Sequence, residues 1–261
     1  MSTSQVKEAV EYIENIFKDV APLILEHAGS VEFTDKHDGS PVTDTDVEVE
    51  NIILAKISER FPQTPIFGEE GGYKDVLPPQ CWLIDPIDGT SSFIKNSGTF
   101  TSMAVLIQDE EAVAAVIYNP TTEAMYTAHK DRGAFRNGER LDLAKMSMPK
   151  RALCKGRHVQ PLNTLLQARA IRNEIAPEGG GHGFTMVADG RVAARFQMLS
   201  RGGIHDYAPG ALLVNEAGGD IIPIKDTQYT YRTKSFVACH PELSDAIRTN
   251  ISDIRALETP S

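Results

Sequence analysis

The sequence predicts a layered α/β fold, and three patterns favour it. Apolar residues recur at helical spacing near the N-terminus, and two apolar runs at 103–107 and 113–118 have the length of paired strands. Helical and extended patterns then alternate through the second half of the chain, without an obvious linker or repeat. Layers of helices on sheets are the economical way to bury both kinds of apolar face.

The front half begins with two predicted helices. The first is amphipathic, and its apolar stripe consists of Val6, Ala9, Val10, Ile13, Ile16, Phe17 and Val20. Thr45 and Glu48 have the spacing of a capping box at the start of the second helix. This helix carries Asp46 in its first turn and is expected to end before Pro62.

Hairpins and a mixed second half follow. The runs 103–107 and 113–118 form a predicted hairpin across an acidic turn, and Asn137-Gly138 marks a second tight hairpin. The elements expected in the back half are a strand near 192–198, a helix from about Tyr207 to Ala217 closed by Gly218-Gly219, strands at 220–224 and 235–239, and a terminal helix.

Composition limits the classes of protein to consider. With 261 residues and 41% hydrophobic content, the chain can bury a core as one large domain or as two fused halves. No apolar run approaches the roughly 20 residues that span a bilayer, and the N-terminus has no signal-peptide pattern, so we expect a cytoplasmic protein without membrane contact. The formal charge of −10 disfavours nucleic acid as a partner, and an acidic protein that handles an anion needs bound cations.

Cysteine usage argues against a disulfide framework and against a thiolate zinc site. Cys81, Cys154 and Cys239 are odd in number and far apart in the sequence. We expect all three to be buried as small apolar residues.

Two carboxylates three residues apart make the run from Trp82 to Thr90 the most informative stretch. Asp85 is expected to end a buried strand, because Pro86 cannot continue the hydrogen-bond ladder. Asp85, the Ile87 carbonyl and Asp88 then form half of an oxygen shell of the kind that magnesium prefers. The alternative is an ordinary surface turn, since Asp, Pro and Gly are common in turns for conformational reasons.

Other acidic residues could complete such a shell. Glu69 and Glu70 follow an extended run at 64–66, and Asp206 stands at the start of a predicted helix. Each has a structural alternative, as a loop residue or as a helix cap. The acidic segment 35–46 does not fit a calcium-binding EF-hand, because Thr45 occupies the position where that loop requires Glu.

Several motifs together resemble the signatures of the inositol monophosphatase family. They are Gly68-Glu69-Glu70, the run from Trp82 to Phe93, His205-Asp206-Tyr207-Ala208-Pro209-Gly210 and Asn215-Glu216-Ala217-Gly218-Gly219, with further matches at 42–46 and 133–138. The resemblance extends from about residue 6 to residue 240. It implies an αβαβα sandwich and a magnesium-dependent, often lithium-sensitive phosphomonoesterase that is frequently a homodimer.

The resemblance also implies a division of the chain and a metal site. A single unit would comprise an N-terminal half, about 1–145, with most metal ligands, and a C-terminal half, about 146–261, with Asp206 and the substrate-side residues. Two or three Mg²⁺ ions per site would be held by Glu69, Asp85, the Ile87 carbonyl, Asp88 and Asp206. In this scheme Asp85 bridges two of the ions.

Catalytic and phosphate-binding roles follow from the same resemblance. Glu69 and Thr90 would orient and deprotonate the attacking water, with Asp46 positioning it. The phosphate would lie against Asp88 and the amides of Gly89 and Thr90. Bound metal cations can neutralise the charge on the phosphoryl oxygens and stabilise the leaving alkoxide. No protein nucleophile is therefore required.

The sequence departs from the family pattern on the substrate side. His205 stands where the family commonly has Trp, Gln197 where inositol-preferring members have a carboxylate, and Arg195 where they have an aromatic residue. The stretch from Glu178 to Gly183 stands where the family usually shows a small-residue turn over the substrate, and the alternative is that its glycines serve only the backbone conformation. Arg195 and Arg201 are therefore candidates for contact with a second anionic group, as in a bisphosphate substrate.

The substrate class therefore stays open. The expected ligand is a small phosphorylated metabolite such as an inositol phosphate, with histidinol phosphate, fructose 1,6-bisphosphate and 3'-phosphoadenosine or NADP phosphates as alternatives. A haloacid-dehalogenase-type phosphatase is excluded, because its two aspartates are two residues apart and Pro86 occupies that position here. A noncatalytic, metal-dependent binding protein is a further alternative, against which the set Glu69, Thr90 and Asp46 argues.

Overall fold

A computed structural model describes residues 1–36, 39–72, 76–154, 160–176, 179–198 and 202–257. Its helices are α1 (Thr3–His27), α2 (Asp44–Arg60), α3 (Thr90–Ile94), α4 (Gln160–Gln167), α5 (Gly180–Ala188), α6 (Ile204–Glu216), α7 (Ser244–Thr249) and α8 (Ile251–Ala256), with 3-10 turns at Leu143–Lys145 and Pro241–Leu243. Arg201 and Glu178 lie outside the described residues, so the contact predicted for Arg201 has no structural description.

The strands form two large sheets and one small hairpin. The hairpin pairs β1 (Thr34–Asp35) with β2 (Pro41–Val42). The seven-stranded sheet contains, in spatial order, β3 (Ile66–Gly68), β4 (Gln80–Asp88), β5 (Thr101–Gln108), β6 (Glu111–Asn119), β7 (Ala124–His129), β8 (Gly133–Arg136) and β9 (Glu139–Arg140). The five-stranded sheet has the order β11 (Arg172–Ile175), β10 (Arg151–Cys154), β12 (Ala194–Gln197), β14 (Phe236–Cys239) and β13 (Asp220–Pro223).

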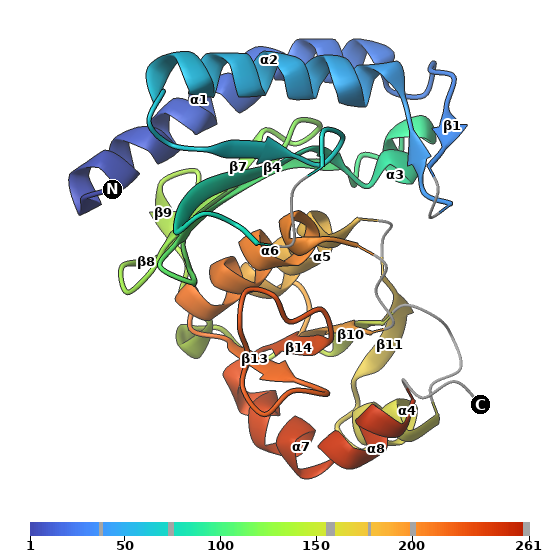
Figure 1. Ribbon diagram of the computed structural model, residues 1–261. Coiled ribbons are helices and arrows are strands. Elements are labelled where there is room, and N and C mark those ends of the chain that lie inside the picture. The colour runs from blue at the N-terminus through green and yellow to red at the C-terminus, as the bar shows by residue number, and fades with distance from the viewer. Residues whose placement is uncertain (37–38, 73–75, 155–159, 177–178, 199–201, 258–261) are drawn as a thin grey trace.

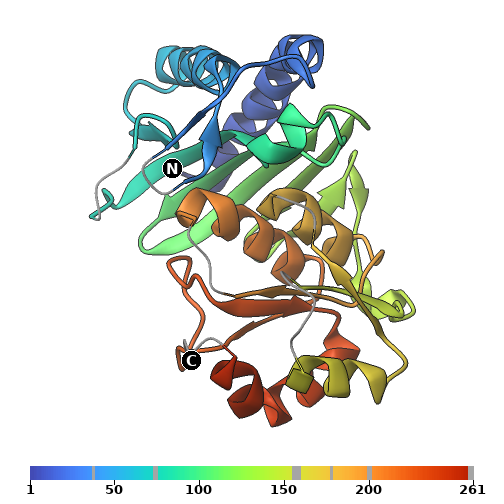
Figure 2. The same ribbon diagram turned by 90° about the vertical axis from the view of Figure 1, so that its right-hand side faces the viewer.

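The elements stack in five layers, which confirms the predicted αβαβα sandwich (Figure 1). Helices α1 and α2 cover one face of the seven-stranded sheet, and α5 and α6 lie between the two sheets. Helices α4, α7 and α8 cover the outer face of the five-stranded sheet. Figure 2, the view turned by 90°, shows the same separation of the layers.

Each interface between layers has its own apolar core. The stripe predicted on the first helix is real, because residues such as Ile13 and Phe17 are fully buried against Trp82 and its neighbours. A fully buried side chain of this size stabilises the fold by about 1.5–3 kcal/mol. The two sheets fall on either side of residue 145. The proposed halves, as units, stay a prediction.

Three local expectations need correction. The capping box of α2 consists of Thr43 and Asp46 rather than Thr45 and Glu48, because the helix begins at Asp44. Strand β4 does not end at Asp85 but continues to Asp88, and a register shift against β5 between Asp85 and Asp88 accommodates Pro86. The glycines at 180–183 open a helix, α5, rather than a turn.

The C-terminal part differs from the expectation in two further places. Helix α6 begins at Ile204, so Asp206 lies inside its first turn and accepts a hydrogen bond from the amide of Gly203. The predicted terminal helix is two short helices, α7 and α8. Both predicted hairpins are confirmed, and the three cysteines are free and buried as expected. Within the described residues, no helix combines the length and apolar composition needed to cross a bilayer.

Candidate metal centre

Two neighbouring strands bring the first acidic residues together. Strands β3 and β4 are parallel, and their register pairs Gly68 with Ile84. Glu69 follows β3, and its amide donates to the Ile84 carbonyl at 3.0 Å, so Glu69 lies beside Asp85 at the same edge of the sheet. The sequence expectation that both residues stand at strand ends therefore holds for Glu69, whereas Asp85 lies within a strand.

Asp85 is the most unusual carboxylate of the group. Asp85 is 1% exposed, and neither of its side-chain oxygens has a hydrogen-bond partner among the described residues. Burial, followed by the charges of Glu69, Asp88 and Asp206, raises the pKa of Asp85 well above its ordinary value. Because a buried carboxylate without a partner is costly, the position calls for a cation.

Asp88 is held from the opposite side by helix α5. Its Oδ1 accepts from the amide of Gly180 at 2.7 Å, and its Oδ2 accepts from the amide of Gly181 at 2.8 Å and from the Thr101 hydroxyl at 3.1 Å. Burial and the charge of Asp206 raise the pKa of Asp88 to about 6, although both amides act in the other direction. A Cβ on Gly181 would lie 2.3 Å from Thr101 Oγ1, so this close approach requires glycine.

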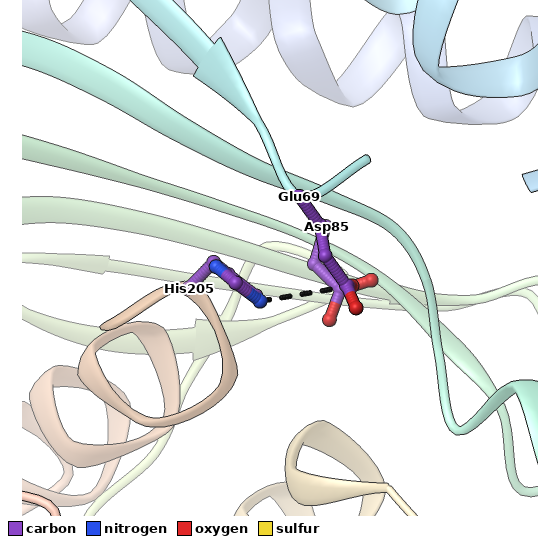
Figure 3. Close-up of side chains that lie close together, drawn as sticks. All are labelled: Glu69, Asp85 and His205. Carbon is purple, nitrogen blue, oxygen red and sulfur yellow. Dashed lines mark ion pairs between the residues drawn. The ribbon is translucent and has the colours of Figure 1, made fainter. Parts of the chain in front are cut away.

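Helix α6 supplies Asp206 and His205. Burial and the charge of Glu69 raise the pKa of Asp206 to about 7. His205 Nε2 lies 3.2 Å from Asp206 Oδ2 and 3.7 Å from Glu69 Oε2. Figure 3 shows the His205 ring on α6 pointing toward Glu69 and Asp85 on the sheet. His205 therefore lies among the carboxylates, and burial lowers its pKa.

Lys36 is a residue of this cluster that the sequence did not single out. It follows β1, and its Nζ lies 2.8 Å from Glu69 Oε1 and 2.7 Å from Glu70 Oε1. No spacing pattern could have identified Lys36, because the contact joins a hairpin to a strand end 33 residues further along the chain.

Among the described residues, the possible metal-binding side chains form two overlapping groups. One contains Glu69, Asp85 and His205, and the other contains Asp85, Asp88 and Asp206, with ligand atoms in each group within 4.8 Å of one another. Three of the four carboxylates in these groups are raised in pKa by burial and by one another. Such a donor set fits a hard divalent cation that prefers oxygen ligands, such as Mg²⁺.

The residues predicted to handle water and phosphate meet beside this cluster. Thr90 Oγ1 lies 3.1 Å from Asp46 Oδ1 and 3.3 Å from the Ile87 carbonyl oxygen. Asp46 is 1% exposed, and burial raises its pKa even though Thr43 hydrogen bonds to it. Gly89 has a φ of 83°, a left-handed conformation that turns the chain from β4 into α3.

Arg195 and Gln197 on β12 form a pair that is separate from the carboxylate cluster and that packs against Phe184 on α5. Arg195 Nη2 donates to Gln197 Oε1 at 3.1 Å, and Arg195 Cζ lies 4.9 Å from the centroid of the Phe184 ring. Within the described part of the chain, the buried Nε and Nη1 atoms of Arg195 have no hydrogen-bond partner. Across the described part of the chain, no hydrogen bond or ion pair joins this pair to the four carboxylates, although the charges of Arg195 and Asp88 influence each other's pKa.

Comparison with known proteins agrees with this geometry. The family model described as the inositol monophosphatase family matches residues 2–256. An inositol monophosphatase of Dictyostelium discoideum is 28% identical over 222 residues, which cover 80% of this chain and 82% of that protein. The 3'(2'),5'-bisphosphate nucleotidase CysQ of Aggregatibacter actinomycetemcomitans is 30% identical over 220 residues, which cover 80% of this chain and 81% of that protein.

A solved structure supports the fold independently. The IMPase of Thermotoga maritima superposes with a TM-score of 0.84 and 23% sequence identity, over 97% of this chain and 100% of that chain. This likeness concerns the fold, whereas the match to the family model spans nearly the whole sequence, including every acidic residue described above. The chain belongs to the inositol monophosphatase family and is a metal-dependent phosphomonoesterase.

Proposed function

We propose that this enzyme hydrolyses the phosphate ester of a small metabolite with the help of two Mg²⁺ ions. The observation that carries the proposal is Asp85, a buried carboxylate for whose two oxygens the described residues provide no hydrogen-bond partner. Asp85 also belongs to both groups of possible ligands, which supports a bridging role between two ions. Glu69, Asp88, Asp206 and the Ile87 carbonyl would supply the remaining protein ligands.

The chemistry divides between the metal and the chain. When bound, Mg²⁺ supplies positive charge for the phosphoryl and leaving-group oxygens and favours ionisation of the attacking water. Glu69 would accept the proton of the water and Thr90 would orient the water through its hydroxyl oxygen, and the Thr90–Asp46 contact of 3.1 Å supports a role for Asp46 in holding that hydroxyl. The turn at Gly89 leads the amides of Gly89 and Thr90 to the phosphate.

One observation favours a substrate with a second acceptor group. Arginine carries only donors, so the oxygen of the Gln197 amide must face Arg195 and its NH₂ group must point elsewhere. A Cβ on Gly183 of α5 would lie 1.9 Å from Arg195 Nη1, and the amides of Gly180 and Gly181 on the same helix donate to Asp88, which supports placing the pair of Arg195 and Gln197 near the substrate. An NH₂ group can donate to the oxygens of a second phosphate, whereas a carboxylate at the same position would repel that phosphate.

The test is a magnesium-dependent phosphate-release screen of the full chain. The substrates are inositol phosphates, fructose 1,6-bisphosphate, histidinol phosphate, adenosine 3',5'-bisphosphate and NADP. We expect release from at least one of them, loss of release in EDTA, and recovery with added Mg²⁺. Tight binding of one of these compounds without any release would instead support the noncatalytic alternative.

Two further expectations accompany the function. The homodimer and the cytoplasmic location stay predictions. Sedimentation of the purified protein at several concentrations measures the first, because the mass of a dimer is twice 28.6 kDa. Imaging of a tagged chain in its own cell measures the second.

A further inference from the structure

Glu50 belongs to neither group of possible ligands among the described residues, but its carboxylate contacts the backbone next to Glu69. Glu50 stands on α2 and is 4% exposed. Its Oε2 accepts from the amide of Glu70 at 2.8 Å, and its Oε1 accepts from the amide of Gly71 at 2.9 Å. Both oxygens of Glu50 are therefore used by the backbone that follows Glu69.

The backbone before Glu69 is shaped to the same carboxylate. A Cβ on Gly68 would lie 2.1 Å from Glu50 Cδ and within 2.4 Å of both its oxygens. Gly68 shows no positive φ, so close approach explains this glycine, rather than an unusual backbone conformation. Glu50 thus contacts the chain on both sides of Glu69.

These contacts leave Glu69 little freedom. Its own amide is fixed to the Ile84 carbonyl at 3.0 Å, and the next two amides are fixed by Glu50. Hydrogen bonds from amides to an ionised carboxylate are roughly twice as strong as neutral ones. The orientation of the Glu69 side chain toward Asp85 therefore depends on a residue 19 positions earlier in the chain, on a different element.

We propose that Glu50 is the positioning residue for Glu69 and that it sets the affinity of the site for Mg²⁺ without touching the metal. This inference rests on the proposed role of Glu69 as a metal ligand. Residues that orient metal ligands typically change metal affinity by about 10–100-fold when they are replaced. The geometry of Glu50 fits such a role, because its oxygens bind the backbone amides that follow Glu69 and are not among the possible metal ligands.

The first experiment separates position from charge. Mg²⁺ is titrated calorimetrically into wild type, Glu50→Gln, Glu50→Asp and the control Glu48→Gln, whose carboxylate is exposed on the same helix. Glu50→Asp keeps the charge but is one methylene too short to reach both amides. We expect about tenfold weaker binding in both Glu50 variants and none of this loss in the control. Wild-type affinity in Glu50→Asp beside weak binding in Glu50→Gln would assign the effect to charge alone and overturn the proposal.

The second experiment uses the contact between Gly68 and Glu50. Gly68→Ala alone pushes a methyl group into the carboxylate and should weaken Mg²⁺ binding without any change of charge. The double variant Gly68→Ala/Glu50→Ala removes the collision, so its loss should be smaller than the sum of the two single losses. Additive losses would show that the two residues act independently and would contradict the proposal.

A final variant separates this inference from the proposed function. Glu69→Gln should weaken Mg²⁺ binding more than any Glu50 variant does, while the melting temperature of the metal-free protein stays close to wild type. Wild-type affinity in Glu69→Gln would remove the basis of the proposed function. Weak binding in Glu69→Gln together with wild-type affinity in the Glu50 variants would overturn only the role of Glu50.

Discussion

The two sides of helix α5 carry opposite kinds of unsatisfied groups. On the side of the seven-stranded sheet, the two buried oxygens of Asp85 find no donor among the residues that the structure describes. On the side of the five-stranded sheet, the buried Nε and Nη1 of Arg195 find no acceptor among the same residues. The first region needs a cation, and the second needs an acceptor or an anion.

The contrast explains why the chemistry can be inferred more firmly than the substrate. The carboxylates around Asp85 raise one another's pKa, and either protonation or a positive charge among them relieves that repulsion. Arg195 is partly satisfied by Gln197 and by the ring of Phe184, so several occupants would complete its surroundings. The carboxylates around Asp85 therefore specify the kind of ligand that they bind more narrowly than Arg195 does.

The largest effect is expected from Asp85→Asn. The amide carries no charge and is a weaker ligand for a hard cation than the carboxylate, so phosphate release should fall by about 10³-fold or more. Asp85 repels three neighbouring carboxylates and makes no hydrogen bond with any described residue that the substitution would break, so the metal-free protein should melt at a higher temperature than wild type. The exposed Asp226→Asn is the control. A variant that keeps its activity would refute the metal-binding role of this region.

Replacement of Thr90 tests the link between the metal and the water-handling residues. Thr90→Val keeps the shape but removes the hydroxyl that contacts Asp46, and kcat should fall by about 10²-fold with little change in Mg²⁺ affinity. Thr90→Ser, which retains the hydroxyl, should keep most of the activity. Equal losses in the two variants would indicate that the methyl group matters, through packing, rather than the hydroxyl.

A smaller effect is expected on the substrate side. Gln197→Glu replaces the NH₂ donor with an acceptor while keeping a partner for Arg195. One lost polar contact of about 1.4 kcal/mol lowers kcat/KM about tenfold for a bisphosphate substrate. The Mg²⁺ affinity of Gln197→Glu should equal that of wild type. The control Gln63→Glu, at an exposed position, should keep both its kcat/KM and its Mg²⁺ affinity. An unchanged preference among substrates would show that Gln197 does not contact the leaving group.

Local patterns explain how far the sequence could predict the site. Asp85 and Asp88 come from one nine-residue strand, and Glu69 follows the strand beside it, so chain spacing and parallel pairing together predict their proximity. The layered fold followed from periodicity in the same way. Asp206 was found by its motif, because nothing in the spacing of a residue on a distant helix connects it to β4.

Contacts between distant elements set the limit of that prediction. The amides of Gly180 and Gly181 reach Asp88 across 92 and 93 positions, and Lys36 reaches Glu69 from a hairpin. The early end predicted for β4 failed for a related reason, since a register shift against β5 accommodates Pro86 and no neighbouring residue signals that shift. The contacts of Glu50 could not be predicted from the sequence, because its carboxylate accepts hydrogen bonds from backbone amides, and every residue type except proline has such an amide.

The smallest predicted effect is a pH dependence of stability that separates the two regions once more. An unfolded aspartate has a pKa near 3.9, whereas the pKa of Asp88 is about 6 and that of Asp206 about 7. These two carboxyl groups therefore bind more protons in the folded metal-free protein than in the unfolded chain, and their contribution to stability falls as pH rises from about 4 through 7. Added Mg²⁺ binds the ionised carboxylates, so its stabilising effect on the melting temperature should be small at pH 5 and larger at pH 8.

Two variants separate the regions. Asp85→Asn should flatten both trends, whereas Gln197→Glu should leave both unchanged, because the titrating carboxylates lie on the metal side of α5. A melting temperature that rises steadily from pH 5 to pH 8 without metal would contradict the assigned crowding of the carboxylates.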